Sequence, residues 1–337
     1  MNIHQWRTHI KKFNEPFEDN KEIQKEWAVN AEQNIPRFNK ENSIINLEFK
    51  YYMEQEKAIV LVGSSPCLKE DVKKLKELDD NFRIICANSA LRYLLKHGVR
   101  PHYVISLDSD KIDIPQHLDC DSEGITLLAS AITSPVALDK WKGPIFYMCY
   151  ESKYIDKNVM RRMKRRLGPA HITGGNSMST AFYIATGIMQ AKTVIFVAHE
   201  YCFDKKDYYA DKTAAKQEVI GTTVGVIDIK GRQRYTQSSL FSYAIWTEKA
   251  ISDLSYAGFF IDTSYGIMGR NCKELKHMEL SEAIDLVKKA FQTKNVLNKS
   301  KKTKKEILKE LVPHEQSEVL RYDMHEQRER FLRLKGS

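Results

Sequence analysis

Short apolar runs rich in β-branched residues alternate with helix-spaced segments over the middle of the chain. The runs are AIVLVG at 58–63, RIICAN at 83–88, YVISLD at 103–108, ITLLAS at 125–130, IFYMCY at 145–150, TVIFVAHE at 193–200 and GFFIDTS at 258–264. Continuous apolar runs of this length, interleaved with helices, are typical of parallel strands buried on both faces. The pattern therefore predicts an α/β, Rossmann-like fold: a mostly parallel sheet with helices on both faces.

The flanks differ from this middle region. Helical segments are expected within it at 70–78, 90–97, 135–140, after Gly175 and at 240–254, and VGVID at 224–228 predicts a short excursion. Residues 1–50 have helical apolar spacing, and the residues beyond about 280 are helical and highly charged. We expect a helical lead-in over 1–50, an α/β domain over 51–280, and a charged helical or partly disordered tail over 281–337.

Composition narrows the class of protein. The chain has 337 residues, of which 42% are hydrophobic, enough for a sizeable core. No apolar run approaches the roughly 20 residues of a membrane span, and the first residues lack the apolar stretch of a signal peptide, so we expect a cytoplasmic location. The six cysteines form no CxxC pair, which argues against a zinc or disulfide framework.

The net charge of +9 is concentrated at 160–166 and 288–305. Such runs are usually solvated faces, and no nucleic-acid-binding motif accompanies them, so we expect no nucleic-acid partner. The helical termini are where an oligomer could form.

Small and polar residues follow four of the predicted strands. The Gly63-Ser64-Ser65-Pro66 loop follows the first, Asn88 and Ser89 the second, Asp108 the third and His199-Glu200 a later one. Ligands of parallel sheets bind where such strands end, so these residues predict a phosphate site at which Gly63 permits close backbone approach. The alternative is an ordinary helix-entry turn. The loop matches neither GxxxxGK[ST] nor GxGxxG.

Two further elements belong to the predicted site. Gly174-Gly175 lead into a helix that opens with Asn176 and Ser177, whose backbone N–H groups could face a ligand; the alternative is a small-residue helix packed tightly on the sheet. Asp108-Ser109-Asp110 has the D-x-D spacing with which many nucleotide-sugar enzymes hold Mg²⁺ or Mn²⁺. Capping of a polar turn is the alternative for both aspartates, and no cofactor is certain.

The motifs VGSSPCLKED, IICANSALRYLLKHGVRPHYVISLDSD, GGNSMSTAFYIATGIMQAKTVIFVAHEYCF and IDTSYGIMGRN together resemble the motility-associated (Maf) flagellin glycosyltransferase family. That family shares a domain with the 6-hydroxymethylpterin pyrophosphokinases of the MptE-like type, and the domain is similar to bacterial sialyltransferases that use CMP-activated sialic acids. The resemblance covers roughly residues 50–275.

The resemblance implies a CMP-sugar donor, a protein or glycan acceptor, and nucleotide contacts from the Gly63–Pro66 loop, Asn88 and Gly174-Gly175. This chain departs from the sialyltransferase pattern in three places. Ser65 replaces a glycine, Cys67 replaces a serine, and Arg234-Tyr235-Thr236 stands where those enzymes place a histidine base. The pyrophosphokinases carry denser acidic clusters at two places. The matching positions of this chain read Ser106-Leu107-Asp108-Ser109 and Gly174-Gly175-Asn176-Ser177, so it lacks several of those carboxylates.

Sugar transfer needs a base for the acceptor hydroxyl and donors for the leaving phosphate. We expect His199 as the base, titrating near pH 6.5, with Glu200 orienting it; a packed strand-end histidine is the alternative. Asp108 and Tyr235 are the next candidates. Donors to the phosphate are expected among Tyr201, Tyr209, Arg234 and Tyr235. The sequence therefore favours a glycosyltransferase, with an ATP-dependent pyrophosphokinase or a non-catalytic nucleotide-binding scaffold as alternatives.

Overall fold

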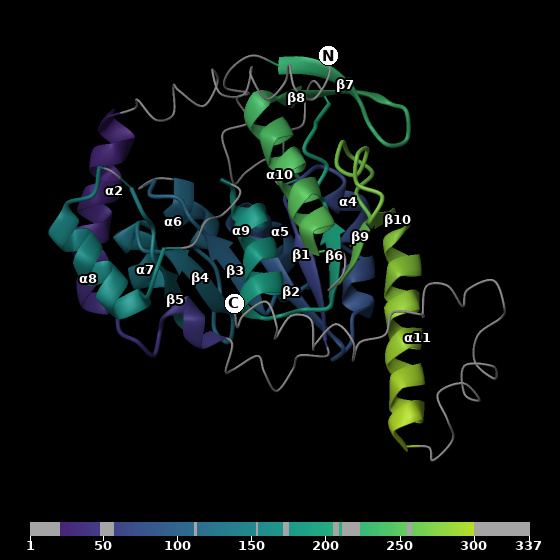
Figure 1. Cartoon of the computed structure of the whole chain (residues 1–337), viewed down its shortest axis with the longest axis horizontal. Coiled ribbons are helices and arrows are strands. Elements are labelled where there is room, and N and C mark those ends of the chain that lie inside the picture. Colours follow the sequence, from purple (N-terminus) through teal and green to yellow (C-terminus); the bar gives the residue numbers. More distant parts are fainter. Residues whose placement is uncertain are drawn as a thin grey trace.

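A computed structural model describes residues 21–47, 57–110, 113–152, 154–170, 175–204, 209–210, 223–254 and 258–299. Its centre is an eight-stranded sheet in the order β10-β9-β6-β1-β2-β3-β4-β5 (Figure 1). The strands are β1 Ala58–Val62, β2 Phe82–Ala87, β3 Tyr103–Ser106, β4 Thr126–Ser130, β5 Ile145–Met148, β6 Thr193–Val197, β9 Phe259–Asp262 and β10 Leu275–His277. Every neighbouring pair is parallel, which confirms the predicted α/β class.

Helices cover both faces of this sheet (Figure 1). They are α2 Lys21–Asn34, η1 Ile35–Arg37, η2 Ile44–Asn46, α4 Leu68–Asp71, η3 Lys74–Glu77, α5 Asn88–Lys96, α6 Asp113–Leu118, α7 Pro135–Lys140, α8 Lys157–Leu167, α9 Ser177–Tyr183, the π-helical turn η4 Ile184–Ile188, α10 Ser238–Leu254 and α11 Leu280–Lys299. Among the described residues, no helix is long and apolar enough to cross a membrane.

Side-chain alternation along each strand builds two cores. Along β1, Val60 and Val62 point into a core shared with α2, α5, α7, α8 and α11. Ile59 and Leu61 point to the opposite face, where α9, η4 and α10 pack. Because both faces are covered, the strands carry apolar residues at nearly every position, and this is why they appear in the sequence as continuous runs.

The structure corrects the sequence expectations in some details. The helix predicted at 70–78 is split into α4 and η3. The predicted excursion near 224–228 is β7 Thr223–Ile227, which pairs antiparallel with β8 Gln233–Gln237, a strand the pattern did not predict. The short strand β10 was missed as well. Of the lead-in and the tail, residues 1–20, 48–50 and 300–337 lie outside the described part of the chain.

Helix α2 is part of the domain core. Its Ala31 and the following Ile35 are fully buried in the same core as β1, and Asn30 and Asn34 are buried beside them. The tail also contributes, since Leu280, Ile284 and Val287 of α11 lie in that core. The domain limits expected at residues 51 and 280 stay predictions.

Gly63 ends β1 against the backbone that follows β6. A Cβ atom built on Gly63 would lie 2.3 Å from the carbonyl oxygen of Ala198, a distance that real side chains do not reach. The Gly63 N–H also donates to the Val197 carbonyl at 2.9 Å. The neighbouring backbone after β6 therefore requires glycine at this position. The expectation that Gly63 also makes room for a phosphate stays a prediction.

We predict that Gly63→Ala lowers the free energy of unfolding by about 1–3 kcal/mol, because the added methyl group forces the β1 and β6 loops apart. Urea denaturation measures the change. Gly225→Ala is the matched control, since the nearest atom to its new Cβ is 3.9 Å away, and it should change stability by less than about 0.5 kcal/mol. Equal stability of the two variants would contradict the close approach.

Candidate functional site

The polar residues predicted at the strand ends lie at one edge of the sheet. Strands β6, β1, β2 and β3 are consecutive neighbours and parallel, so the residues after Val197, Val62, Ala87 and Ser106 emerge on the same side. The Ser89 hydroxyl donates to the Ser64 hydroxyl at 2.9 Å and joins two of these loops. We call this region the carboxyl edge.

Two buried polar atoms at the carboxyl edge stand out. Asn88 opens α5, and its side-chain oxygen accepts the Ser89 N–H at 2.8 Å, but within the described residues its Nδ2 has no hydrogen-bond partner. The Ser106 hydroxyl likewise has none. The register pairs Ala87 with Ile105, so Asn88 and Ser106 each come directly after one member of this pair. A buried polar group without a partner costs about 1–3 kcal/mol, so this pair of atoms is where a polar ligand could be recognised.

The charge of Asp108 acts on two tyrosines from distant parts of the chain. Protein atoms around the Asp108 carboxyl group desolvate it and so raise its pKa, although the residue as a whole is exposed. The charge of Asp110 raises this pKa further. Burial raises the pKa of Tyr150 and of Tyr243, and the charge of Asp108 adds to both shifts. We call these three residues the Asp108 group; it combines a carboxyl group of raised pKa with two phenols that stay protonated.

Gly175 and Asn176 reach the same region. Gly175 has φ +92°, and a Cβ there would lie 3.0 Å from the ring of Tyr243. Asn176 caps α9: its side-chain oxygen accepts the Ser179 N–H at 2.7 Å, and the Ser179 hydroxyl accepts the Asn176 N–H at 3.2 Å. This reciprocal capping box is the structural use of Asn176. Ser177 is the half-buried first residue of α9, and Gly174 lies outside the described residues.

Most backbone N–H groups of the Gly63–Cys67 loop donate hydrogen bonds to other groups of the protein. The Ser65 N–H donates to the Ala198 carbonyl at 3.4 Å, and the Cys67 N–H donates to the Glu200 carboxylate at 3.3 Å. The Ser65 hydroxyl accepts the Glu200 N–H at 3.3 Å. A carboxylate of the chain thus accepts an N–H group of this loop, and the phosphate role of the loop stays a prediction.

Glu200 is a structural anchor in this structure. Its side chain is 2% exposed and forms an ion pair of 2.9 Å with Arg234, which is 8% exposed. Burial raises the pKa of Glu200, and Arg234 opposes that shift. Arg234 also lies 3.4 Å from the exposed carboxylate of Asp204. Glu200 bonds Arg234 and Cys67, not the imidazole that it was expected to orient, and that expectation is corrected.

His199 is a buried neighbour of aromatic rings. Its ring centroid lies 5.2 Å from Phe196 and 5.9 Å from Tyr201, and its backbone N–H donates to the Ser264 hydroxyl at 2.7 Å. Burial lowers the pKa of His199 to about 3, so the expectation that this histidine titrates near pH 6.5 is wrong. A base must reach the acceptor hydroxyl, and a side chain that is 3% exposed is poorly placed to do so.

The other predicted residues have varied settings. Tyr235 of β8 is half-buried and exchanges backbone hydrogen bonds of 2.8 and 2.9 Å with Phe203, which attaches the β7–β8 ribbon beside β6. Asp108 and Asp110 are both exposed, and among the described residues no three His, Cys, Asp or Glu side chains cluster as a metal site. Binding of Mg²⁺ or Mn²⁺ by this pair stays a prediction.

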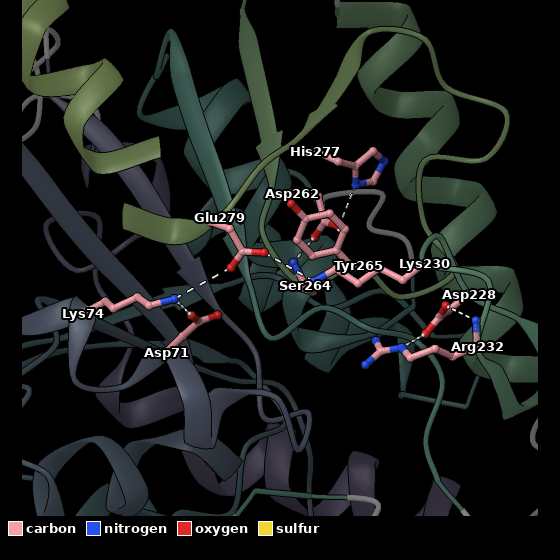
Figure 2. A network of polar contacts seen from close by, with 10 residues as sticks. All are labelled: Asp71, Lys74, Asp228, Lys230, Arg232, Asp262, Ser264, Tyr265, His277 and Glu279. Atoms are coloured by element: carbon pink, nitrogen blue, oxygen red, sulfur yellow. Dashed lines mark hydrogen bonds and ion pairs between the residues drawn. The ribbon is translucent and has the colours of Figure 1, made fainter. Parts of the chain in front are cut away.

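A polar network closes the β9 side of the carboxyl edge (Figure 2). Asp262 accepts from the N–H groups of Ser264 and Tyr265 and from His277 Nδ1 at 3.1–3.2 Å. Four ion pairs and a cation–π contact complete the network: Lys74 with Asp71 at 3.0 Å and with Glu279 at 3.9 Å, Lys230 with Glu279 at 3.3 Å, Arg232 with Asp228 at 2.7 Å, and Lys230 over the Tyr265 ring at 3.8 Å. These groups satisfy one another, so the network holds the β7–β8 turn and the start of α11 together.

Sequence reasoning missed Ser106, Tyr150 and Tyr243. Ser106 and Tyr150 could have been found, because each stands at or just after the end of a predicted strand. Tyr243 lies within α10, some 90 residues after Tyr150, and no sequence signal places it beside Asp108.

The fold and the carboxyl edge define an α/β protein with a polar ligand site at the ends of parallel strands. The model of the family described as "6-hydroxymethylpterin diphosphokinase MptE-like" matches residues 29–206, more than half of the chain. The protein therefore belongs to the MptE-like family. No curated protein matches the chain.

Among solved structures, the chain is similar to a Maf glycosyltransferase from Magnetospirillum magneticum AMB-1, with a TM-score of 0.53 and 16% sequence identity. The match covers 70% of this chain but only 36% of that one, so this chain corresponds to about a third of the larger protein. At this identity the similarity supports the fold.

We predict that stability falls as the pH is lowered through the His199 titration. Because the folded-state pKa is near 3 and the unfolded-state pKa near 6.5, the unfolded chain binds the extra proton, and the contribution of neutral His199 is complete only above about pH 6.5. Between pH 6.5 and 5 the expected loss is about 2 kcal/mol. His199→Phe should remove this part of the pH dependence in urea denaturation, whereas an unchanged slope would contradict the buried neutral imidazole.

We predict that Glu200→Gln destabilises the fold by about 3–5 kcal/mol, because it removes the buried counter-charge of the Arg234 guanidinium and leaves it only the exposed carboxylate of Asp204. Thermal or urea denaturation measures the loss. The control is Asp253→Asn, which removes the partner of Lys249 in an exposed pair of 2.8 Å and should cost less than about 1 kcal/mol. Similar losses in both variants would show that the Glu200–Arg234 pair does not anchor the loops.

Proposed function

We propose that the protein is a nucleotide-sugar-dependent glycosyltransferase that moves a nonulosonic, sialic-like acid from a CMP donor to a protein or glycan acceptor. The observation that carries the proposal is the pair of buried, unpartnered atoms, Asn88 Nδ2 and Ser106 Oγ, beside the Asp108 group. The similarity in fold to a Maf glycosyltransferase supports the reaction class.

The chemistry of these residues suits a nucleotide-sugar donor. The Asn88 amide can donate to a carbonyl or hydroxyl of the nucleoside, and the Ser106 hydroxyl can either donate or accept. Tyr150 and Tyr243 stay protonated because their pKa values are raised, so both can donate hydrogen bonds to a phosphate or a sugar carboxylate. Such donors stabilise the negative charge that develops on a departing nucleotide.

Asp108 is the base that this arrangement favours. Its carboxylate is exposed, and its raised pKa makes it a stronger proton acceptor than an ordinary aspartate. In the proposed reaction Asp108 takes the proton of the acceptor hydroxyl while the hydroxyl oxygen bonds to the anomeric carbon. The glycosidic bond to the phosphate breaks, and CMP leaves with the bonding electrons.

The family description favours one alternative, an ATP-dependent diphosphokinase that acts on a hydroxymethylpterin-like substrate. That reaction needs a divalent metal ion between the ATP phosphates, and Asp108 with Asp110 would have to hold it. The second alternative is a binding protein of this fold that has no turnover.

We predict that Ser106→Ala leaves the free energy of unfolding unchanged or raises it, because the mutation removes an unpaired buried hydroxyl, but weakens CMP binding by about 10-fold. Thermal shift across CMP, CDP, UDP, GDP, ADP and ATP, followed by calorimetry, identifies the nucleotide.

We predict that Asp108→Asn lowers CMP release from a CMP-nonulosonate by about 10²–10⁴-fold with little change in CMP affinity.

Three results would decide against this function. Release of AMP from ATP and a hydroxymethylpterin would establish the diphosphokinase. Nucleotide binding without either reaction would establish a binding protein. Unaltered CMP affinity in Ser106→Ala would show that the unpartnered pair does not recognise the nucleotide.

A further inference from the structure

Helix α2 carries two fully buried asparagines on one face. Asn30 and Asn34 are four residues apart, so their side chains lie one above the other, and both are 0% exposed. Asparagine is mostly a surface residue, and a buried amide must find partners for two donor hydrogens and one acceptor oxygen. Two buried asparagines in an otherwise apolar contact therefore call for an explanation.

Their amides bind four backbone carbonyls in two loops. Asn30 Nδ2 donates to the carbonyls of Ser109 at 3.0 Å and Ile132 at 3.1 Å. Asn34 Nδ2 donates to the carbonyls of Ala131 at 3.1 Å and Thr133 at 2.8 Å. The first loop follows β3 and the second follows β4, so both belong to the carboxyl edge. We call these four bonds the asparagine clamp.

The clamp has an energetic cost. Within the described residues neither side-chain oxygen, Asn30 Oδ1 nor Asn34 Oδ1, has a hydrogen-bond donor, and each such buried acceptor costs about 1–3 kcal/mol. Turning either amide over would place oxygen against carbonyl oxygens, so the orientation is unambiguous. The structure thus tolerates two unpaired oxygens in order to hold four carbonyls.

The clamped loops carry the candidate site. Ser109 directly follows Asp108, and the Thr133 hydroxyl donates to the Ser106 carbonyl at 3.0 Å, which ties the β4 loop to the unpartnered Ser106. The same helix also contacts the Asp108 group, because the Trp27 ring packs edge-on against Tyr150 with centroids 5.5 Å apart. Helix α2 therefore contacts Tyr150 directly. It restrains Asp108 through the bond to Ser109, and Ser106 through the bonds to and from Thr133.

We propose that Asn30 and Asn34 are positioning residues for the ligand site, and that helix α2, which precedes the sheet in the chain, is a wall of this site. The clamp fixes the loops after β3 and β4, and with them the position of Asp108, the residue directly before Ser109. The identity of the ligand rests on the proposed function, whereas the restraint on the loops does not depend on it.

The test compares Asn30→Leu and Asn34→Leu with Ser43→Ala. Leucine keeps the branching and the number of side-chain heavy atoms of asparagine, although it is bulkier, and it has no donor, so it removes the clamp bonds. Ser43 is the matched control, because it also lies in the N-terminal segment and its buried hydroxyl donates to a backbone carbonyl, that of Leu167 at 2.7 Å, in α8 rather than at the clamped loops. Thr133→Val is a milder change of the same loops if a leucine variant fails to fold.

Hydrogen exchange of the ligand-free protein is the first measurement, and CMP affinity by calorimetry is the second. We expect exchange at residues 107–110 and 131–134 to rise at least 10-fold in Asn30→Leu and Asn34→Leu, and in Thr133→Val to a smaller extent, with CMP affinity falling at least 10-fold in the leucine variants. Ser43→Ala should leave the exchange of the two loops and the CMP affinity unchanged, even if it lowers the melting temperature as much as the leucine variants do.

Two outcomes would overturn the proposal. One is unchanged exchange in the two loops of the clamp variants. The other is a fall in affinity equal to that of Ser43→Ala, which would mean a general loss of stability. If the wild-type protein binds none of the nucleotides, the proposed function fails, and the exchange measurement still decides whether the asparagines hold the loops.

Discussion

The carboxyl edge depends on one buried ion pair. Glu200 follows β6, bonds Arg234 of β8 at 2.9 Å and accepts the Cys67 N–H from the loop after β1. Removing one partner of a buried pair leaves an uncompensated charge, so these three segments must keep one arrangement. The Gly63–Ala198 approach and the Phe203–Tyr235 backbone bonds both lie next to this pair in the chain.

The polar residues at this edge divide into two groups with different physical roles. Glu200, Asn176 and the N–H groups of Gly63, Ser65 and Cys67 are paired with other groups of the protein and define its shape. Asn88 Nδ2 and Ser106 Oγ are buried without a partner in the described residues, and Asp108 is exposed with a raised pKa. The second group has bonding capacity left for a ligand, which is why the proposed function rests on it and not on the glycine loop.

The asparagine clamp extends the site beyond the sheet. The match to the MptE-like family begins at residue 29, just before Asn30, so the family domain includes both clamp residues. Helix α2, which precedes the first strand of the sheet in the chain, supports the loops after β3 and β4. The ion pairs of Figure 2 support the opposite side of the carboxyl edge, near β9. The edge is restrained from both sides and carries its unpaired groups between them.

The sequence by itself determined the parallel α/β class and the edge at which polar residues collect, because continuous apolar runs and strand-end residues are local features. It could not assign roles at that edge. His199, Glu200 and Gly63 looked like site residues, and only the tertiary structure showed their buried packing, ion pair and close backbone approach. Asn30, Asn34 and Tyr243 looked like ordinary helix residues. Their importance arises from contacts between segments 79 to 135 residues apart, and such long-range contacts leave no periodic signal in the chain.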